Sequence, residues 1–258
     1  MLTRILTGVL LAPLVVLLFL LGPDWAKAGV VILAGALCLT ELYAMALPSH
    51  GVERWVGIAL GTAILVSKWL APESDVGDWL PALLVPALSV VARPEPIDGA
   101  AFRVFALWAG MLYVVVPFAY GVDLAVQPEP WILVVLGVVW SGDTGAYFAG
   151  RALGRHKLHP KVSPKKTVEG AIGGLIASVG GGFLLVALLD LPLPPWKTAL
   201  FSLFGGALAQ LGDLGESLVK RACGVKDSGT ILPGHGGMLD RVDGVIFAFP
   251  FFWWALSL

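Results

Sequence analysis

Residues 168–190 read VEGAIGGLIASVGGGFLLVALLD, a nearly continuous run of apolar and small residues with one carboxylate near each end. About 20 such residues in a helix match the hydrocarbon thickness of a bilayer. A membrane β-strand would instead alternate in polarity over about ten residues. The stretch therefore predicts a membrane-spanning helix. Its glycines predict close packing against another helix rather than a nucleotide-binding loop.

The composition extends this prediction to the whole chain. Of its 258 residues, 57% are hydrophobic and only 14% are charged, whereas a soluble domain carries about 25% charged residues. We expect an all-α, polytopic transmembrane bundle with about five spans in residues 1–125 and about four in a catalytic region at residues 126–258. The nine expected spans are 4–21, 26–47, 54–71, 76–92, 101–121, 131–150, 168–190, 197–222 and 241–258.

The first apolar run could also be interpreted as a targeting segment. Residues 4–21 are followed by Ala26-Lys27-Ala28, which resembles the end of a secretory signal. The run is long for a signal, and many further spans follow it. We therefore expect a first membrane helix.

The positions of the basic residues predict the orientation in the membrane. With a cytoplasmic N-terminus and nine spans, all but three of the 17 Lys and Arg residues fall on the cytoplasmic side, the exceptions being Lys27, Lys68 and Lys197. This bias follows the positive-inside rule. The net charge of −1 indicates no nucleic-acid partner.

Two polar segments on the expected cytoplasmic side, 140–170 and 212–244, are candidates for an active site. Among their acids, Asp143, Asp213, Asp240 and Asp243 lie at the ends of expected spans or within them. Carboxylates near a bilayer are costly and usually functional, although a helix cap or an ion pair with an arginine is the structural alternative. Asp240 and Asp243, three residues apart, share one helix face. They would repel each other without a cation, and oxygen ligands near phosphate favour Mg²⁺.

The same segments carry bases interspersed with Ser, Thr and Gly. Lys165-Lys166 lies in the first segment, and Lys220-Arg221 and Lys226 lie in the second. Attraction to lipid headgroups would need only charge, so this mixture favours phosphate binding. Asp213, Ser217 and Lys220 recur at helical spacing on one face, with Arg221 beside them.

A glycine-rich turn, Pro233-Gly234-His235-Gly236-Gly237, follows these bases. Its backbone N–H groups could approach a phosphate chain closely, and His235 could be an acid, a base or a hydrogen-bonding wall. Neither GxxxxGK[ST] nor a GxGxxG strand–helix unit is present, so the common soluble nucleotide folds are excluded. Metal-binding carboxylates, cations and this turn together predict phosphoryl or nucleotidyl transfer.

The order and spacing of these motifs resemble the phosphatidate cytidylyltransferase (CDP-diglyceride synthase) family. The resemblance is close over the C-terminal half and rests on four consecutive motifs, Ser217-Leu218-Val219-Lys220-Arg221, Lys226-Asp227, Pro233-Gly234-His235-Gly236-Gly237 and Asp240-Arg241-Val242-Asp243. Further matching stretches are Asp143-Thr144-Gly145-Ala146-Tyr147, Gly150-Arg151, Ser163 through Gly170, and the opening Arg4-Ile5-Leu6-Thr7.

This resemblance implies that CTP and phosphatidic acid react to give CDP-diacylglycerol and pyrophosphate, with Mg²⁺, in a bacterial cytoplasmic (inner) membrane. It implies Asp213, Asp240 and Asp243 as metal ligands, with Lys220 and Arg221 as further catalytic residues. The implied substrate-binding residues are Asp143, Ser163, Lys165, Lys166, Thr167, Ser217, Lys226, His235, Gly236, Gly237 and Arg241. Membrane lipids would surround the protein. A homodimer and a second cation are compatible with the sequence, which fixes neither.

Two other functions remain open. A CTP-dependent polyprenol or phytol kinase would use similar spans and bases but transfer the γ-phosphoryl group to a lipid alcohol. A transporter would typically show internal repeats and broken helices near the midplane. The sequence has no convincing repeat, and its polar residues gather at one membrane face.

Overall fold

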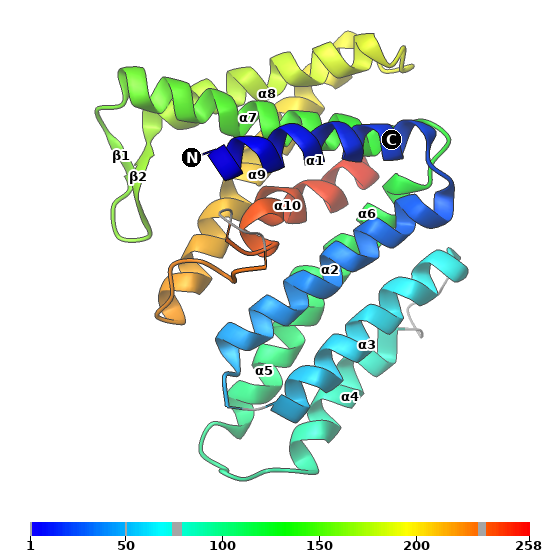
Figure 1. Ribbon diagram of the computed structural model, residues 1–258, viewed down its shortest axis with the longest axis vertical. Coiled ribbons are helices and arrows are strands. Elements are labelled where there is room, and N and C mark those ends of the chain that lie inside the picture. Colours follow the sequence, from blue (N-terminus) through cyan, green and yellow to red (C-terminus); the bar gives the residue numbers. More distant parts are fainter. Residues whose placement is uncertain (1, 50, 74–78, 232–235) are drawn as a thin grey trace.

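The computed structural model describes residues 2–49, 51–73, 79–231 and 236–258, and these are helical apart from one short β-hairpin (Figure 1). The helices are α1 (Leu2–Leu21), α2 (Asp24–Ala46), α3 (Gly51–Leu70), α4 (Leu80–Val91), α5 (Ala100–Gly110), α6 (Val116–Ala125), α7 (Trp131–Leu153), α8 (Val168–Leu188), α9 (Pro195–Ala222) and α10 (Leu239–Leu256). One π-helical turn, Met111–Val115, joins α5 and α6 into a continuous helix from Ala100 to Ala125.

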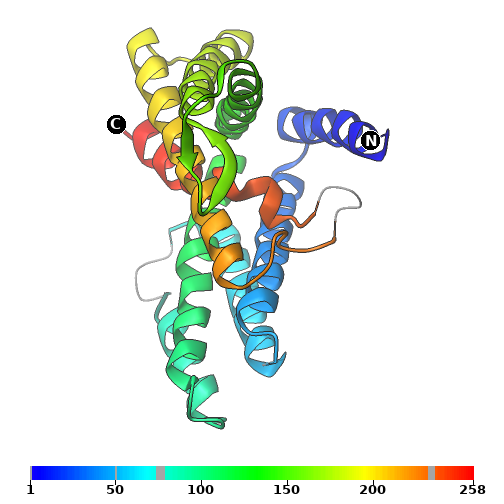
Figure 2. The same cartoon turned by 90° about the vertical axis from the view of Figure 1, so that its left-hand side faces the viewer.

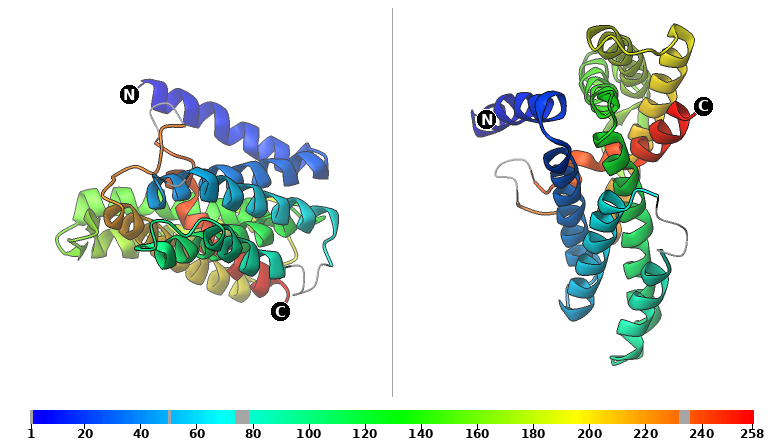
Figure 3. Two further views of the ribbon diagram at one scale, coloured as in Figure 1. Left: turned by 90° about the horizontal axis from the view of Figure 1, so that it is seen from below. Right: turned by 90° about the vertical axis from the view of Figure 1, so that its right-hand side faces the viewer.

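The described helices follow the predicted spans closely. Each predicted span overlaps one continuous helix, and α6 runs four residues past the predicted end at residue 121. The predicted start of the fourth span, residues 76–78, lies outside the described residues. Four of these helices, α2, Ala100–Ala125, α7 and α8, are long and apolar enough to cross a membrane. By length and composition they fit a polytopic helical membrane protein. Figures 2 and 3 show α1 at one side of the molecule, away from α8 and α9.

The glycines of residues 168–190 pack α8 against α7, as predicted. A Cβ atom added to Gly173 would clash with Ala149 Cβ, and one added to Gly181 would clash with Ser141 Oγ. Gly145 on the α7 side faces Ala177 in the same way. Small residues on both helices therefore allow the two backbones to approach, which is how membrane helices associate.

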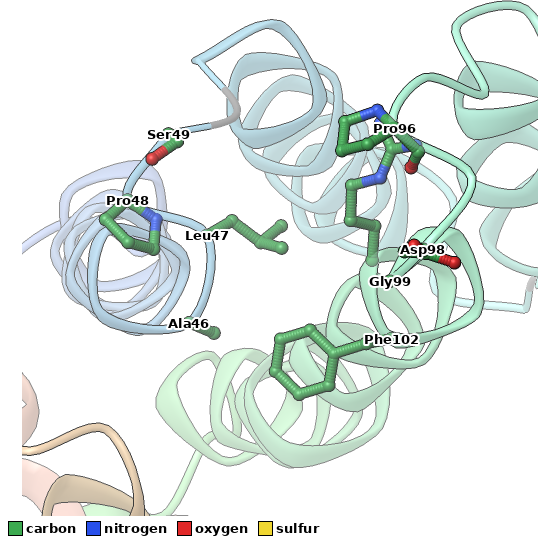
Figure 4. Close-up of a pocket in the computed structure, with 9 residues that line it drawn as sticks. Ala46, Leu47, Pro48, Ser49, Pro96, Asp98, Gly99 and Phe102 are labelled. Atoms are coloured by element: carbon green, nitrogen blue, oxygen red, sulfur yellow. The ribbon is translucent and has the colours of Figure 1, made fainter.

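The N-terminal helices enclose a buried ion pair. Arg103 of α5 donates to Glu53 of α3 at 2.8 Å, and its guanidinium also reaches the carbonyls of Arg93 and Pro94. Arg103, at the start of the expected span 101–121 and counted among the cytoplasmic-side bases, is only 3% exposed. A pocket of about 160 Å³ lies beside it (Figure 4), lined by Ala46, Leu47, Pro48, Ser49, Pro96, Asp98, Gly99 and Phe102. None of the predicted site residues lines this pocket.

The two halves of the chain share one apolar core. Phe249 of α10 meets Phe118 of α6 edge to face, with ring centroids 5.9 Å apart. A Cβ atom on Gly121 would lie 2.7 Å from the Phe249 ring, so a glycine is required at that contact. Helix α10 is thereby fixed against the N-terminal helices as well as against α9.

A short β-hairpin, which the sequence did not predict, interrupts the otherwise all-α fold of the described residues. β1 (Lys157–His159) pairs antiparallel with β2 (Ser163–Thr167), with Lys157 opposite Thr167 and His159 opposite Ser163. Lys-, Pro- and Ser-rich stretches have little intrinsic strand preference, so only the pairing itself reveals these strands. The hairpin projects beyond one end of α7 and α8 (Figure 1). Thr167 then caps α8 by accepting a hydrogen bond from the Gly170 amide at 3.1 Å.

Candidate active site

Three carboxylates gather where α9 meets the N-terminal part of α10. Asp213, Glu216 and Asp243 each offer an oxygen, and these oxygens lie within 4.8 Å of one another. Asp213 and Glu216 share a face of α9 because they are three residues apart. Gly212 allows the approach of α10, since a Cβ atom there would lie 2.5 Å from the carbonyl oxygen of Asp243.

This acidic cluster fits a divalent cation. Glu216 is 1% exposed, its Oε2 contacts the Lys220 ammonium, and its Oε1 is buried with no hydrogen-bond partner in the described part of the chain. A buried carboxylate oxygen without a partner is costly, and a cation at this position would satisfy it. An all-oxygen donor set of this kind suits Mg²⁺ or another hard cation.

Glu216 is absent from the predicted site. A buried acid one turn from Asp213 in an expected membrane helix was the available signal, because such acids are usually functional. The sequence prediction described the polar face of this helix by Asp213, Ser217 and Lys220, and Glu216 was not included.

Asp240 has different surroundings from the acidic cluster. Its Oδ1 accepts from Lys220 Nζ at 2.5 Å, and its Oδ2 accepts from the amides of Gly237 and Ser228 at 2.8 and 3.0 Å. The Ser228 hydroxyl also lies 3.0 Å from Oδ2. Both oxygens of Asp240 are thus bound by protein donors. Its assignment as a metal ligand stays a prediction.

Lys220 lies between two carboxylates. It is 9% exposed and bridges Glu216 of its own helix to Asp240 of α10. Its described partners are therefore acids, although phosphate binding was predicted for it. The ammonium ties the acidic cluster to the loop that precedes α10.

The two polar segments come together, as the sequence predicted. Lys166 of β2 forms an ion pair with Asp213 of α9, with Nζ and Oδ2 2.6 Å apart. Successive residues of a strand point to opposite faces, so the neighbouring Lys165 points away from Asp213, and it is exposed. Of this lysine pair, Lys166 is the one at the acidic cluster.

Several other predicted residues lie near the cluster without an ion pair to it. Ser217 Oγ is 3.5 Å from Asp213 Oδ1, a long and weak contact. Asp143 and Arg241 are exposed and form no ion pair with the described residues. Their roles stay predictions.

The remaining predicted residues have structural contacts or lie on the surface. Arg221 donates to the carbonyl of Val225 at 3.2 Å, and Lys226 is exposed. Thr167 caps α8, and Ser163 pairs with His159. His235 lies outside the described residues.

The glycines before α10 approach a carboxylate of the protein itself. Gly236 has a φ of +84°, and a Cβ atom on it would lie 2.7 Å from Asp240 Oδ2. The Gly237 amide, predicted to face phosphate, donates to that same oxygen. Gly236 and Gly237, the described residues of this turn, therefore lie close around the Asp240 carboxylate.

Fold and site together fit a class of helical membrane proteins with an acidic cluster that suits a divalent cation and lies beside a lysine. The model of the Cytidylyltransferase family matches residues 2–258. A phosphatidate cytidylyltransferase of Bacillus subtilis is 36% identical over 99% of this chain and 97% of its own length. One of Staphylococcus epidermidis is 33% identical over 93% of this chain and 95% of its own length. One of Brucella suis is 53% identical over 45% of this chain and 43% of its own length. The chain therefore belongs to the phosphatidate cytidylyltransferase family of nucleotidyltransferases.

Proposed function

We propose that the acidic cluster of Asp213, Glu216 and Asp243 is the metal centre of a CTP:phosphatidate cytidylyltransferase. The observation that carries this proposal is the buried, unpartnered oxygen of Glu216 between two further carboxylates. A divalent cation held there, which we take to be Mg²⁺, would neutralise charge on the triphosphate of CTP. The sequence leaves room for a second cation.

The reaction requires positioning more than proton transfer. An oxygen of the phosphatidate phosphate attacks the α-phosphorus of CTP, the bond from that phosphorus to its bridging oxygen breaks, and pyrophosphate leaves with the electron pair. The attacking phosphate is already ionised near neutral pH, so no general base is needed. Lys166 stands beside Asp213, where its charge would attract a phosphate oxygen.

In this proposal Lys220 and Asp240 position the Glu216 carboxylate of the acidic cluster. Asp240 fixes the ammonium of Lys220, and Lys220 in turn contacts one oxygen of Glu216. Glu216 Oε1, which has no hydrogen-bond partner among the described residues, then remains available for the cation. Asp143, Ser217 and Arg241 belong to the same polar region and would contact the substrates. His235 lies outside the described residues, and its three predicted roles, an acid, a base or a hydrogen-bonding wall, stay open.

We place this site at the cytoplasmic face of a bacterial inner membrane. Nine membrane crossings with a cytoplasmic N-terminus leave all but three of the 17 Lys and Arg residues on that side. CTP would then reach the site from the cytoplasm, and phosphatidic acid would reach it from the bilayer. Residues 1–125 would support the catalytic region of residues 126–258, and a homodimer is compatible with this arrangement.

The direct test uses the purified chain with Mg²⁺, phosphatidic acid and α-labelled CTP. We expect label in the lipid fraction together with free pyrophosphate. A polyprenol or phytol kinase would instead transfer label from γ-labelled CTP to a lipid alcohol and release CDP. Absence of α-label from the lipid at any Mg²⁺ concentration would overturn the proposal.

A further inference from the structure

Glu41 of α2 is a buried carboxylate that binds the segment between α9 and α10. It is 3% exposed. Its Oε1 accepts from the amide of Met238 and its Oε2 from that of Leu239, both at 2.9 Å. No cationic side chain of the described residues pairs with it. Figure 2 shows the segment reaching across from α9 towards α2.

The two amides belong to the N-terminus of α10. The first amides of a helix have no partner within the helix, and Met238, at the N-cap position, gives no side-chain cap. Glu41 supplies the cap from another helix. Its negative charge also suits the positive end of the α10 dipole, which explains how the carboxylate is tolerated without a cation.

Ser228 connects this cap to Asp240. Its hydroxyl lies 2.9 Å from Glu41 Oε2 and 3.0 Å from Asp240 Oδ2. The Ser228 hydroxyl oxygen therefore lies between two carboxylates, and its single proton can be donated to only one of them at a time. The Ser228 amide donates to Asp240 as well, at 3.0 Å.

Two glycines let the segment close around Glu41. A Cβ atom on Gly229 would lie 2.6 Å from Glu41 Oε1, and one on Gly237 would clash with Glu41 Oε2. Either side chain would push the segment off the carboxylate. Gly229 and Gly237, one on each side of residues 232–235, thus both pack closely against the Glu41 carboxylate.

We propose that Glu41 is a positioning residue of the active site. It fixes the start of α10 and the Ser228 turn, so that Asp240 holds Lys220 and Asp243 faces the carboxylates of α9. Glu41 touches neither Asp213 nor Glu216 and acts through the loop. This inference rests on the proposed function only where it concerns turnover, since the loop contacts stand without it.

The test compares Glu41→Gln with Glu53→Gln in the full-length protein, reconstituted in lipid. Both substitutions neutralise a buried carboxylate of the N-terminal helices, but Glu53 pairs with Arg103, away from the loop. In the Glu41→Gln variant an NH₂ group replaces one acceptor oxygen, so this group faces a backbone amide of Met238 or Leu239 that then has no acceptor. Hydrogen exchange at residues 236–243 is the structural readout. kcat and KM, per folded molecule, are the functional readouts.

For Glu41→Gln we expect faster exchange at residues 236–243. We also expect kcat to be lower by between about 10- and 100-fold, because small misplacements of catalytic groups are costly. KM for phosphatidate should change less than about twofold, since the variant leaves the lipid-facing helices intact. Glu53→Gln should keep wild-type exchange at these residues and wild-type kcat per folded molecule.

Ser228→Ala provides a second, milder variant should Glu41→Gln fail to fold. Because the Asp240 amide donates to the Ser228 hydroxyl, this variant should speed hydrogen exchange at Asp240. It should also lower kcat, as Glu41→Gln does. Wild-type exchange at residues 236–243 in the folded variants, or a kcat loss equal to that of Glu53→Gln, overturns the proposal. If the wild-type protein transferred no label to lipid, the proposed function would fail, while the exchange comparison would still decide the role of Glu41.

Discussion

Lys166 of β2 and Asp213 of α9 form an ion pair that joins the hairpin to the acidic cluster, with Nζ and Oδ2 2.6 Å apart. The two side chains are 27% and 33% exposed. Exposed pairs of this kind contribute only ~0–1 kcal/mol to stability. The pair therefore matters for the site rather than for stability, because it places the Lys166 ammonium beside the proposed metal centre.

Replacing Lys166 should affect activity far more than stability. For Lys166→Met we expect kcat/KM for CTP to be lower by about 10- to 100-fold, because a charge aimed at the phosphates is lost. The melting temperature should barely change. Lys165→Met is the matched control and should lose much less, since Lys165 points to the other face of the strand. Equal losses of kcat/KM in the two variants would contradict the assignment of the phosphate contact to Lys166 rather than Lys165.

Replacing Glu216 should weaken cation binding. Glu216→Gln removes one charge and turns an NH₂ group towards the cluster or towards Lys220, so we expect the Mg²⁺ concentration for half-maximal activity to rise at least about tenfold. Direct Mn²⁺ binding, followed by electron paramagnetic resonance without CTP, should weaken in parallel. The exposed Glu129→Gln is the control. Unchanged Mn²⁺ affinity in Glu216→Gln would remove Glu216 from the metal centre.

Asp240→Asn tests whether this residue binds the cation or positions Lys220. We expect a folded protein without measurable turnover, because Asn cannot accept from Lys220 and the two amides as Asp240 does. Mn²⁺ affinity should stay near that of the wild type if Asp240 acts through Lys220. A loss of affinity as large as that of Glu216→Gln would instead make Asp240 a ligand, as the sequence predicted.

Alanine substitutions at two glycines of α9 should have opposite effects on stability. A Cβ atom on Gly212 would lie 2.5 Å from the carbonyl oxygen of Asp243, whereas one on Gly215 would meet nothing within 4 Å. Gly212→Ala should push α10 away and lower the stability by about 1–3 kcal/mol, with loss of activity. Gly215→Ala should be neutral or stabilising by up to ~1 kcal/mol, because alanine favours the helix. Thermal unfolding and a Mg²⁺ titration of activity check both variants.

The helices could be predicted from the sequence, whereas the hairpin could not. Residues 168–190 predict α8 by their length and apolar character, and α8 is observed at Val168–Leu188. Ser163–Thr167 carries no comparable pattern. It is a strand because Lys157 and His159 lie opposite it, and pairing of that kind is invisible in a single segment.

The candidate site was predicted in part. Asp213 and Asp243 were singled out because carboxylates near a bilayer are costly, and Lys166 because it lies among Ser, Thr and Gly residues. Glu41, a carboxylate in an apolar helix, carried the same signal but was missed because no polar motif surrounds it. Glu216 was missed because the prediction for α9 rested on Asp213, Ser217 and Lys220. Only the packing of α9 on α10, and of the loop on α2, gives these two acids their partners.

The sequence by itself determined that this protein is a helical membrane protein, which segments are polar, and which family its C-terminal motifs resemble. These properties follow from local composition and spacing, because the bilayer acts on each segment separately. The tertiary structure alone decided which carboxylates share a site and which hold the loop. Asp240 and Asp243 stand on one helix turn, yet the first meets Lys220 and the second meets Asp213 and Glu216. Contacts between distant helices, rather than spacing along the chain, make that distinction.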